Sequence, residues 1–244
     1  MTEGIILETR NLTVGYGRKP VVSGVDMALR AGEITAVAGE NGCGKSTLLK
    51  TLGGAIPPLS GTMEAMGQDI TGLSVKERAK LMAIVMTRAV RPDYFTCHDM
   101  VSSGRYPYTG RLGTLSDHDL DIVEEAMEIT GTCDIKDRYM SEISDGQRQL
   151  VMLSRAIAQE PKILLLDEPT NFLDIKHKKL FADVVKRLVS KGEMTVIMSM
   201  HELDIVKETA DRVMTIKNGG ILKQGKTSDI LTDTFIAELF DLSH

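Results

Sequence analysis

The apolar positions of this sequence fall into short, nearly continuous runs separated by longer segments of mixed composition. Four runs are typical of strands buried on both faces of a sheet: Ile34–Ala38 (ITAVA), Leu81–Met86 (LMAIVM), Lys162–Leu166 (KILLL) and Met194–Met200 (MTVIMSM). Helix-forming segments lie between them at Lys45–Leu52, Ser116–Ile129 and Leu150–Gln159, with Ser116 as a suitable N-cap. Strands that alternate with helices predict an α/β fold on a mainly parallel sheet.

The pattern differs outside this central part of the chain. Two strands, Ile5–Tyr16 and Val21–Leu29, are predicted on either side of a Gly-Arg-Lys-Pro turn, and Gly61–Gly67 predicts another short strand. These segments favour an N-terminal antiparallel β layer beside the main sheet. Further along, Asp211–Gln224 predicts a hairpin that turns at an Asn-Gly pair, and Asp229–Leu242 predicts a terminal helix.

From Thr87 to about Ser141 the composition shifts toward charged residues and helix formers. We therefore expect a helical subdomain, at about 88–158, inserted into the α/β core. No flexible linker or repeat interrupts the pattern, so the whole chain, 1–244, is expected to form a single domain.

Two tyrosines stand out in the expected insertion. Tyr106 and Tyr108 flank a proline in the stretch Gly104–Gly110 (GRYPYTG), which predicts an exposed turn. Aromatic side chains on an exposed turn favour contact with a partner, whereas packing onto the core is the alternative.

Composition narrows the class of protein. Of 244 residues, 42% are hydrophobic and 26% are charged, which is ordinary for a globular protein. The net charge of −5, from 29 basic and 34 acidic residues, provides no basic footprint, so nucleic acid is not an expected partner. No apolar run is long enough to span a bilayer and no signal peptide is evident, so we expect the chain to stay in the cytosol. Cys43, Cys97 and Cys133 are widely spaced and indicate neither disulfides nor a zinc site.

The strongest chemical signal is the segment GENGCGKST. Its glycines allow successive backbone N–H groups to point at a phosphate without an obstructing side chain. Lys45 adds a mobile positive charge for the β- and γ-phosphates, and the Ser46 hydroxyl can ligate Mg²⁺. The segment therefore predicts a phosphate-binding loop between a buried strand and a helix whose N-terminus favours anions. The candidate nucleotide-binding residues are Gly39, Glu40, Asn41, Gly42, Cys43, Gly44, Lys45, Ser46 and Thr47.

Two residues near this loop have alternative interpretations. Tyr16, at the end of the first predicted strand, could stack on an adenine ring or could cover the core at a strand end. Cys43 lies inside the loop, where its role is that of a small side chain; a reactive thiol is the alternative.

Carboxylates and a histidine follow two of the predicted strands. In enzymes with a phosphate loop, a carboxylate at a strand tip is the second Mg²⁺-side group, a role that Asp167 would fill here. Because neighbouring residues of a strand point to opposite sides, Glu168 would face an attacking water. His201 follows another strand, and open α/β sheets bind ligands at this edge.

The order of these motifs resembles that of the ATP-binding cassette (ABC) ATPases. The phosphate loop is followed by the helical insertion, by a Ser-Asp-Gly-Gln motif at the start of a helix, by the strand that ends in Asp167-Glu168, and by His201. The resemblance extends over essentially the whole chain. It implies a phosphate-loop NTPase core that binds ATP with Mg²⁺ and hydrolyses the nucleotide.

The resemblance also implies a pairing of two chains. In this family two cassettes dimerise head to tail, so the signature motif of one copy caps the γ-phosphate held by the other. Here that signature comprises Ser144, Gly146 and Gln147, and the loop after Glu168 extends from Asn171 to Asp174. Lys45, Glu168 and His201 are the implied catalytic residues, and His201 would also contact the Asp174 region of the opposite chain.

The sequence departs from the family pattern at two positions. Asp145 stands where the family usually has glycine, so a negative charge near a triphosphate needs a compensating partner. Thr87 stands where the family usually has a glutamine that touches Mg²⁺, and a threonine is shorter, so we do not count Thr87 among the ligands.

Within the family, GRYPYTG, SDGQ and the compact length resemble importer ATPases for iron–siderophore complexes, haem and cobalamin. This resemblance implies two transmembrane permease subunits, an external substrate-binding protein and a location on the cytoplasmic face of the membrane. Tyr106 and Tyr108 would lie beside the groove that takes a cytosolic helix of the permease.

Other functions remain open at this point. One alternative is a soluble cassette ATPase of an iron–sulfur cluster assembly machine. Another is a nucleotide-gated interaction protein without turnover, against which the intact Lys45, Asp167, Glu168 and His201 argue. The cargo is not determined by this chain, because the external binding protein and the membrane channel select it.

Overall fold

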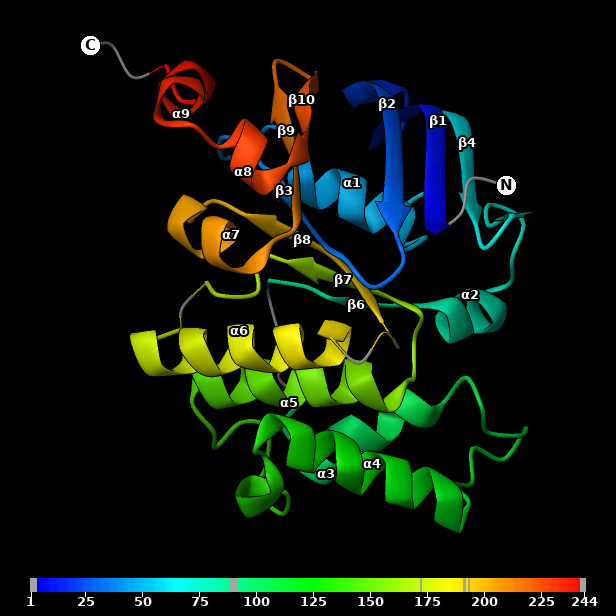
Figure 1. Cartoon of the computed structure of the whole chain (residues 1–244). Helices are drawn as coiled ribbons and strands as arrows, with labels where there is room; N and C mark the ends of the chain where they lie inside the picture. Colours follow the sequence, from blue (N-terminus) through cyan, green and yellow to red (C-terminus); the bar gives the residue numbers. More distant parts are fainter. Residues whose placement is uncertain (1–3, 88–91, 172, 191, 193, 242–244) are drawn as a thin grey trace.

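The core of the protein is a six-stranded sheet. The computed structural model describes residues 4–87, 92–171, 173–190, 192 and 194–241 (Figure 1). The sheet has the order β10-β9-β3-β8-β7-β6, in which neighbouring strands are parallel except for β10, which pairs antiparallel to β9. Its strands are β3 (Ile34–Ala38), β6 (Met82–Val85), β7 (Ile163–Asp167), β8 (Thr195–Met200), β9 (Arg212–Lys217) and β10 (Gly220–Lys226). The predicted parallel core and the C-terminal hairpin are confirmed.

A second, antiparallel sheet packs beside the first. It has the order β2-β1-β4-β5 and contains β1 (Ile5–Tyr16), β2 (Lys19–Arg30), β4 (Ser60–Ala65) and β5 (Gln68–Asp69). Helix α1 (Lys45–Leu52) lies between the two sheets in Figure 1, and Leu48, Leu49 and Leu52 are buried there. The predicted N-terminal β layer is therefore confirmed.

Side chains of the central strands divide between two apolar clusters. Ala36 and Ala38 of β3 face one cluster, whereas Val37 faces the cluster that contains the antiparallel layer. This division follows from the period of two along a strand, and burial on both faces explains why these segments are apolar throughout.

The other face of the main sheet carries the long helices. Figure 1 shows α6 (Ile175–Ser190) next to the sheet, then α5 (Asp145–Ala158), with α3 (Cys97–Ser102) and α4 (Asp117–Thr130) farthest away. Short 3₁₀ turns, η1 (Ser103–Arg105) and η2 (Cys133–Ile135), join these helices. The helices lie in the described part, 92–158, of the segment predicted to be a helical insertion, whose first residues, 88–91, lie outside the described residues, and Ser116 caps α4 as expected.

The remaining helices differ more from expectation. The segment predicted as one terminal helix, Asp229–Leu242, instead takes part in α8 (Thr227–Ile230) and α9 (Asp233–Leu239), and Leu242 lies outside the described residues. Thr232 is extended and its hydroxyl accepts from the Phe235 N–H, so it starts a new helix rather than continuing one. Helices α2 (Val75–Leu81) and α7 (Leu203–Thr209) complete the fold.

A buried ion pair holds the helical lobe together. Arg105 is 3% exposed; its Nε donates to Asp119 Oδ1 at 2.9 Å, and its Nη1 donates to the Ala158 carbonyl at 2.8 Å. Asp119 Oδ2 also accepts from the Ser116 hydroxyl at 2.6 Å. Hydrogen bonds from Ser116, and secondarily the Arg105 guanidinium, lower the pKa of Asp119 to about 2.

We expect Asp119→Asn to lower the free energy of unfolding at pH 7 by about 2 kcal/mol, because the hydrogen bonds of the folded state stabilise the ionised carboxylate of Asp119. The pKa of Asp119 is lower in the folded state than its value of about 4 in the unfolded chain. The ionised carboxylate therefore stabilises the folded state fully at pH values above 4, and this stabilisation is lost as the pH falls toward 2. Urea unfolding between pH 7 and pH 3 should therefore show the variant and wild type converging below about pH 4. Asp117→Asn, on an exposed position of the same helix, is the control. A difference independent of pH would contradict this role.

Candidate nucleotide-binding site

The phosphate loop joins β3 to α1 in a conformation that requires glycine. Gly39, Gly42 and Gly44 have φ values of 151°, 81° and 108°, where other residues are strained. A Cβ atom at Gly39 would lie 2.4 Å from the Ile216 carbonyl oxygen, and one at Gly44 would lie 2.4 Å from a Val22 methyl group. The neighbouring strands therefore leave no room for larger residues at these two positions.

Lys45 and Ser46 begin helix α1. Lys45 is 3% exposed, and its Nζ donates to the Gly39 carbonyl at 2.8 Å and to the Glu40 carbonyl at 2.9 Å, so the ammonium group lies inside the curve of the loop. Gly44, the N-cap, offers no side-chain acceptor, and the first turn has no acidic residue. The N–H groups at this helix end are thus available for an anionic ligand.

The other loop residues differ in exposure. Glu40, Asn41 and Gly42 are exposed, whereas Thr47 is buried. Cys43 is half-buried and packs against the apolar cluster around α1. Burial raises the pKa of the Cys43 thiol, although the nearby Lys45 opposes the shift, so the thiol stays protonated as a small packing group.

Tyr16 lies on the hairpin that borders the loop. Its side chain is 51% exposed at the end of β1 and pairs in register with Lys19 of β2. The same hairpin contributes Val21 and Val22, which pack against Gly44. About half of Tyr16 is thus exposed, and stacking of its ring on an adenine stays a prediction.

Asp167 connects the phosphate loop with two strands of the sheet. It is 2% exposed at the end of β7, and its Oδ1 accepts from the Ser46 hydroxyl at 2.7 Å and from the Ser199 hydroxyl at 2.8 Å. The Thr87 hydroxyl lies 3.1 Å from its Oδ2 and 2.9 Å from its main-chain carbonyl oxygen. Thr87 therefore contacts the carboxylate itself, in keeping with its short side chain.

Glu168 is held in an unusual backbone conformation. Its φ is 45°, in the left-handed region, and its N–H donates to the Ser199 hydroxyl at 2.9 Å. Its carboxylate accepts from Asn171 Nδ2 at 2.6 Å, while Asp167 turns toward Ser46. The two carboxylates thus have separate side-chain partners, but β7 ends at Asp167, so the left-handed turn at Glu168 rather than the alternation of a strand directs the second carboxylate.

Sequence reasoning assigned no role to Ser199, which bonds to both acidic residues. It is 0% exposed within the apolar strand β8, directly opposite Asp167 in the parallel register. A hydroxyl in an otherwise apolar strand is the signal that marks it, because a buried polar group needs a hydrogen-bond partner. Asn171, which holds Glu168, belongs to the loop that the family resemblance pointed to.

His201 follows β8 and is exposed at the same edge of the sheet. The next residue, Glu202, ties this segment to its surroundings: it accepts from Thr170 Oγ1 at 3.1 Å and from Lys178 Nζ at 2.5 Å. These bonds hold the Glu202 side chain, next to His201 in the chain.

The Ser-Asp-Gly-Gln motif caps helix α5. The Ser144 hydroxyl accepts from the Gln147 N–H at 3.2 Å, and Gln147 Oε1 accepts from the Ser144 N–H at 3.0 Å, which is a capping box. A Cβ at Gly146 would lie 3.1 Å from the ring of His177. The His177 ring in turn lies 2.8 Å from Asp174 Oδ1, so His177 lies between Asp174 and the glycine of the signature.

Asp145, the first departure from the family pattern, has the compensating charge that it requires. Arg148 Nη1 donates to Asp145 Oδ1, and Arg148 Nη2 donates to the Ile143 carbonyl at 2.7 Å and to the Met140 carbonyl at 3.0 Å. The buried Arg148 guanidinium therefore offsets the negative charge of Asp145 and also holds the backbone segment that precedes the signature motif.

The two groups of residues are separate within one chain. Within the described ranges, no hydrogen bond joins the signature residues to the phosphate loop.

Tyr106 and Tyr108 have different surroundings. Tyr106 is 72% exposed. The Tyr108 hydroxyl donates to the Gln159 carbonyl at 3.0 Å, and the Arg105 guanidinium lies 4.1 Å from the centre of its ring. Only Tyr106 is therefore fully available to a partner, because Tyr108 also fastens the turn to α5.

The donor set fits Mg²⁺ with a nucleotide. No cluster of three or more His, Cys, Asp or Glu side chains able to hold a metal occurs in the described part of the chain. A hydroxyl and a carboxylate, Ser46 and Asp167, suit Mg²⁺, which completes its octahedral shell with waters and phosphate oxygens. Among the helices of the described residues, none has the length and apolar character needed to span a membrane.

Comparison with known proteins shows to which family the chain belongs. Residues 22–171 match the model of the ABC transporter family. The chain is 38% identical over 239 residues to an uncharacterized ABC transporter ATP-binding protein of Methanocaldococcus jannaschii, covering 98% of this chain and 82% of that protein. It is 34% identical over 236 residues to the iron(3+)-hydroxamate import ATP-binding protein FhuC of Bacillus subtilis, covering 97% and 88%.

Two further similarities are relevant. The cobalamin import ATP-binding protein BtuD of Halobacterium salinarum is 34% identical over 235 residues, which cover 96% of this chain and 58% of that protein. A solved structure provisionally assigned to a metal-chelate type ABC transporter, in an inward-facing conformation, superposes with a TM-score of 0.86 at 30% identity, covering 98% of this chain and 90% of that one. The chain thus belongs to the ABC transporter family and is an ATP-binding cassette ATPase.

Proposed function

We propose that this chain is the ATPase subunit of an importer that takes up iron–siderophore complexes, haem or cobalamin. The observation that carries the ATPase part is the contact of Ser46 with Asp167, which brings the phosphate loop to the acidic pair. The import part is supported by the relatives named for iron(3+)-hydroxamate and cobalamin import. The iron–sulfur assembly alternative is not favoured, because these relatives are named as import proteins.

In the proposed reaction, the loop N–H groups and Lys45 bind the phosphates of ATP, and Tyr16 stacks on the adenine ring. Ser46 and Asp167 would hold Mg²⁺, which would supply positive charge against the negative charge of the transferring phosphoryl group. Glu168 accepts a proton from the attacking water, and Asn171 keeps its carboxylate in place. His201 donates to the γ-phosphate from the neighbouring strand end.

The proposed active form is a homodimer. Ser144 Oγ retains its own hydrogen as a donor, because it accepts rather than donates in the capping box. Together with the first N–H groups of α5 it completes the site around the γ-phosphate held by the other copy. Gly146 and Asp174 reach that site together, because His177 packs on the former and bonds to the latter. ATP then favours the closed pair because it contacts both copies.

The proposed partners in the membrane are two permease subunits, with an external substrate-binding protein on the far side. The chain would lie at the cytoplasmic face, and the exposed Tyr106 would contact a permease. Closure and reopening of the cassette dimer would move the permease segments attached to it. To shift the cassettes from almost entirely open to almost entirely closed, ATP would have to bind the closed dimer more tightly than the open form by roughly 5.5 kcal/mol.

Substituting Glu168→Gln should reduce steady-state hydrolysis of Mg²⁺-ATP by about 10²-fold or more, because the amide cannot accept the water's proton. ATP binding and an ATP-dependent dimer in size-exclusion chromatography should remain. Phosphate release measured with and without Mg²⁺ is the assay, and Glu124→Gln, an exposed carboxylate on α4, is the control. Turnover at the wild-type rate in the Glu168 variant would rule out its role as base. Absence of turnover in the wild type itself would favour a nucleotide-gated interaction protein.

For the tyrosines, we expect Tyr106→Ala to weaken binding of the chain to membranes that contain the permease, because an exposed aromatic contact is lost. Tyr108→Phe removes only the hydrogen bond to Gln159 and should bind normally with a slightly lower melting temperature. Co-sedimentation and thermal unfolding measure the two effects. If Tyr106→Ala sediments like wild type, the contact lies elsewhere.

A further inference from the structure

A buried serine lies in the centre of the main sheet, close to the edge that carries the phosphate loop and the acidic pair. Ser199 is the next-to-last residue of β8 and is 0% exposed. It lies between Val37 of β3 and Asp167 of β7, its partners on either side in the parallel register. A buried hydroxyl inside a sheet costs free energy unless it is hydrogen-bonded. The partners of the Ser199 hydroxyl therefore indicate what this residue does.

The Ser199 hydroxyl has two partners, whose chemistry fixes the direction of both hydrogen bonds. It donates its proton to Asp167 Oδ1 at 2.8 Å, because a carboxylate only accepts. Its oxygen accepts from the Glu168 N–H at 2.9 Å, because an amide N–H only donates. The same N–H also donates to the Ser199 carbonyl oxygen at 3.2 Å. One buried hydroxyl thus joins the side chain of the first acidic residue to the backbone of the second.

Three hydroxyls bond to the Asp167 carboxylate, and they differ in exposure. Ser46 and Ser199 donate to its Oδ1 at 2.7 and 2.8 Å, and the Thr87 hydroxyl lies 3.1 Å from its Oδ2. Ser46 and Thr87 are half-buried, whereas Ser199 is closed off from solvent. Ser46 is also the hydroxyl proposed to hold Mg²⁺, so it has a second task. Ser199 holds the carboxylate from the interior of the sheet, where water does not reach the bond.

The second partner, Glu168, is the residue at which the chain leaves the sheet. Strand β7 ends at Asp167, and the φ of 45° at Glu168 is unfavourable for a residue with a side chain. Such a conformation persists only where the surroundings hold it, and here the Glu168 N–H donates to both the hydroxyl and the carbonyl of Ser199. The Glu168 carboxylate is held by Asn171 Nδ2 at 2.6 Å. Ser199 therefore helps to set the direction in which the proposed base points.

We propose that Ser199 is a positioning residue for ATP hydrolysis. Its hydroxyl holds the Asp167 carboxylate in the orientation that serves Mg²⁺ and, through the Glu168 N–H, holds the turn that directs the proposed base. The inference rests on the proposed function, because it takes Asp167 as the Mg²⁺-side group and Glu168 as the base. Since one hydroxyl makes both bonds, its loss impairs metal binding and turnover together.

Binding of the phosphates without metal provides an internal reference. Lys45 Nζ donates to the carbonyl groups of Gly39 and Glu40, so this cation is held within the phosphate loop itself. The first N–H groups of α1 are fixed by the same loop and helix. The affinity for a nucleotide in the absence of metal should therefore stay unchanged when Ser199 loses its hydroxyl.

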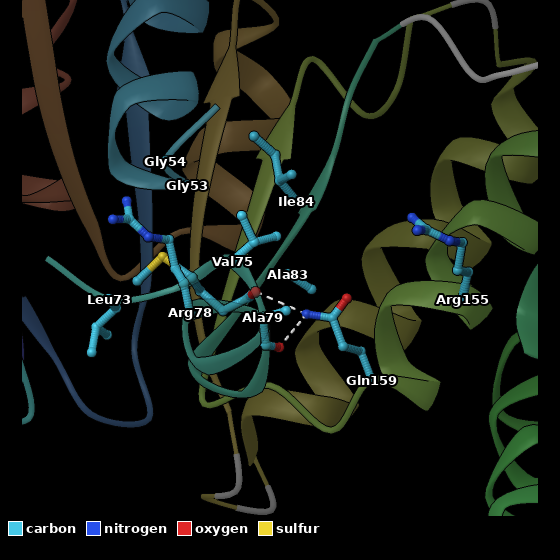
Figure 2. A pocket seen from close by; sticks show the side chains of 11 residues that line it. Gly53, Gly54, Leu73, Val75, Arg78, Ala79, Ala83, Ile84, Arg155 and Gln159 are labelled. Atoms are coloured by element: carbon cyan, nitrogen blue, oxygen red, sulfur yellow. Dashed lines mark hydrogen bonds between the residues drawn. The ribbon is translucent and has the colours of Figure 1, made fainter. Parts of the chain in front are cut away.

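Two buried groups away from the site serve as matched controls. Ser154 is also 0% exposed, and its hydroxyl donates to the Leu150 carbonyl at 2.9 Å within α5. Gln159 Nε2 donates to the carbonyl oxygens of Ala79 and Met82, as the dashed lines in Figure 2 show, and so holds the start of β6. Ser154→Ala and Gln159→Leu each remove buried hydrogen bonds, so they measure the effect of a general loss of stability.

The test uses Mn²⁺ as a spectroscopic substitute for Mg²⁺, followed by electron paramagnetic resonance of the full chain with one equivalent of the non-hydrolysable analogue AMP-PNP. Ser199→Ala should bind Mn²⁺ about tenfold more weakly than wild type, and its kcat with saturating Mg²⁺-ATP should fall about 10- to 100-fold. Its affinity for AMP-PNP in EDTA should not change. Ser199→Thr keeps the hydroxyl and should restore both Mn²⁺ binding and turnover. Both control variants should bind Mn²⁺ and turn over like wild type, and melting temperatures show how far each variant is destabilised.

The inference is overturned if Ser199→Ala binds Mn²⁺ and turns over like wild type, or if only one of the two falls. It is also overturned if a control variant loses both to the same extent, or if Ser199→Thr with the melting temperature of Ser199→Ala is equally impaired. These outcomes leave the proposed function intact as long as wild type binds Mn²⁺ more tightly than free AMP-PNP does. If it does not, the proposed Mg²⁺ site fails together with the inference. Where the isolated chain has no turnover, the Mn²⁺ measurement alone decides.

Discussion

The parallel register of the central strands is the constraint on which the whole site depends. Ala38 of β3 pairs with Met200 of β8, and Ser199 of β8 pairs with Asp167 of β7, so three strands end at one edge of the sheet. The phosphate loop, the acidic pair and His201 each follow one of these strands. Hydrogen bonds from Ser46 and Ser199 to one carboxylate oxygen of Asp167 then lock the three segments together. Because these bonded groups are buried or half-buried, a shift of one strand would leave several of them unpaired.

A few buried cations organise the helical lobe in a similar way. Arg105 joins α4 to the end of α5 through Asp119 and the Ala158 carbonyl, and Arg148 joins the start of α5 to the preceding loop. Each guanidinium has several acceptors, which offsets the cost of burying its charge. Arg155 lies on the same helix and differs in having only the Ser103 hydroxyl.

The extent to which sequence anticipated structure varied with the kind of signal. Strands buried on both faces were found with small errors at their ends, because apolar runs of this short length with turn or charged residues at their ends favour a buried strand over a helix. Helix α2 has no buried residue, so it offers no apolar stripe; only the capping box of Ser74 and Glu77 marks its start. Helix α6 does have an apolar stripe, at Phe181, Val184, Val185 and Leu188, from which it could have been predicted. The prediction of a single terminal helix was wrong because Thr232 caps a second helix, α9, within the predicted one.

The sequence by itself determined the chemistry of the site. The glycine spacing, Lys45, Ser46 and the pair Asp167-Glu168 specify a phosphate-binding and Mg²⁺-binding arrangement, because few other residue combinations satisfy those geometric and charge requirements. Tertiary structure alone decided what holds these groups and which of them are free. The bonds of Ser199 and Thr87 to Asp167 and the contact of His177 with Gly146 join residues that are distant in the chain. Such contacts depend on strand register and helix packing, which local composition does not encode.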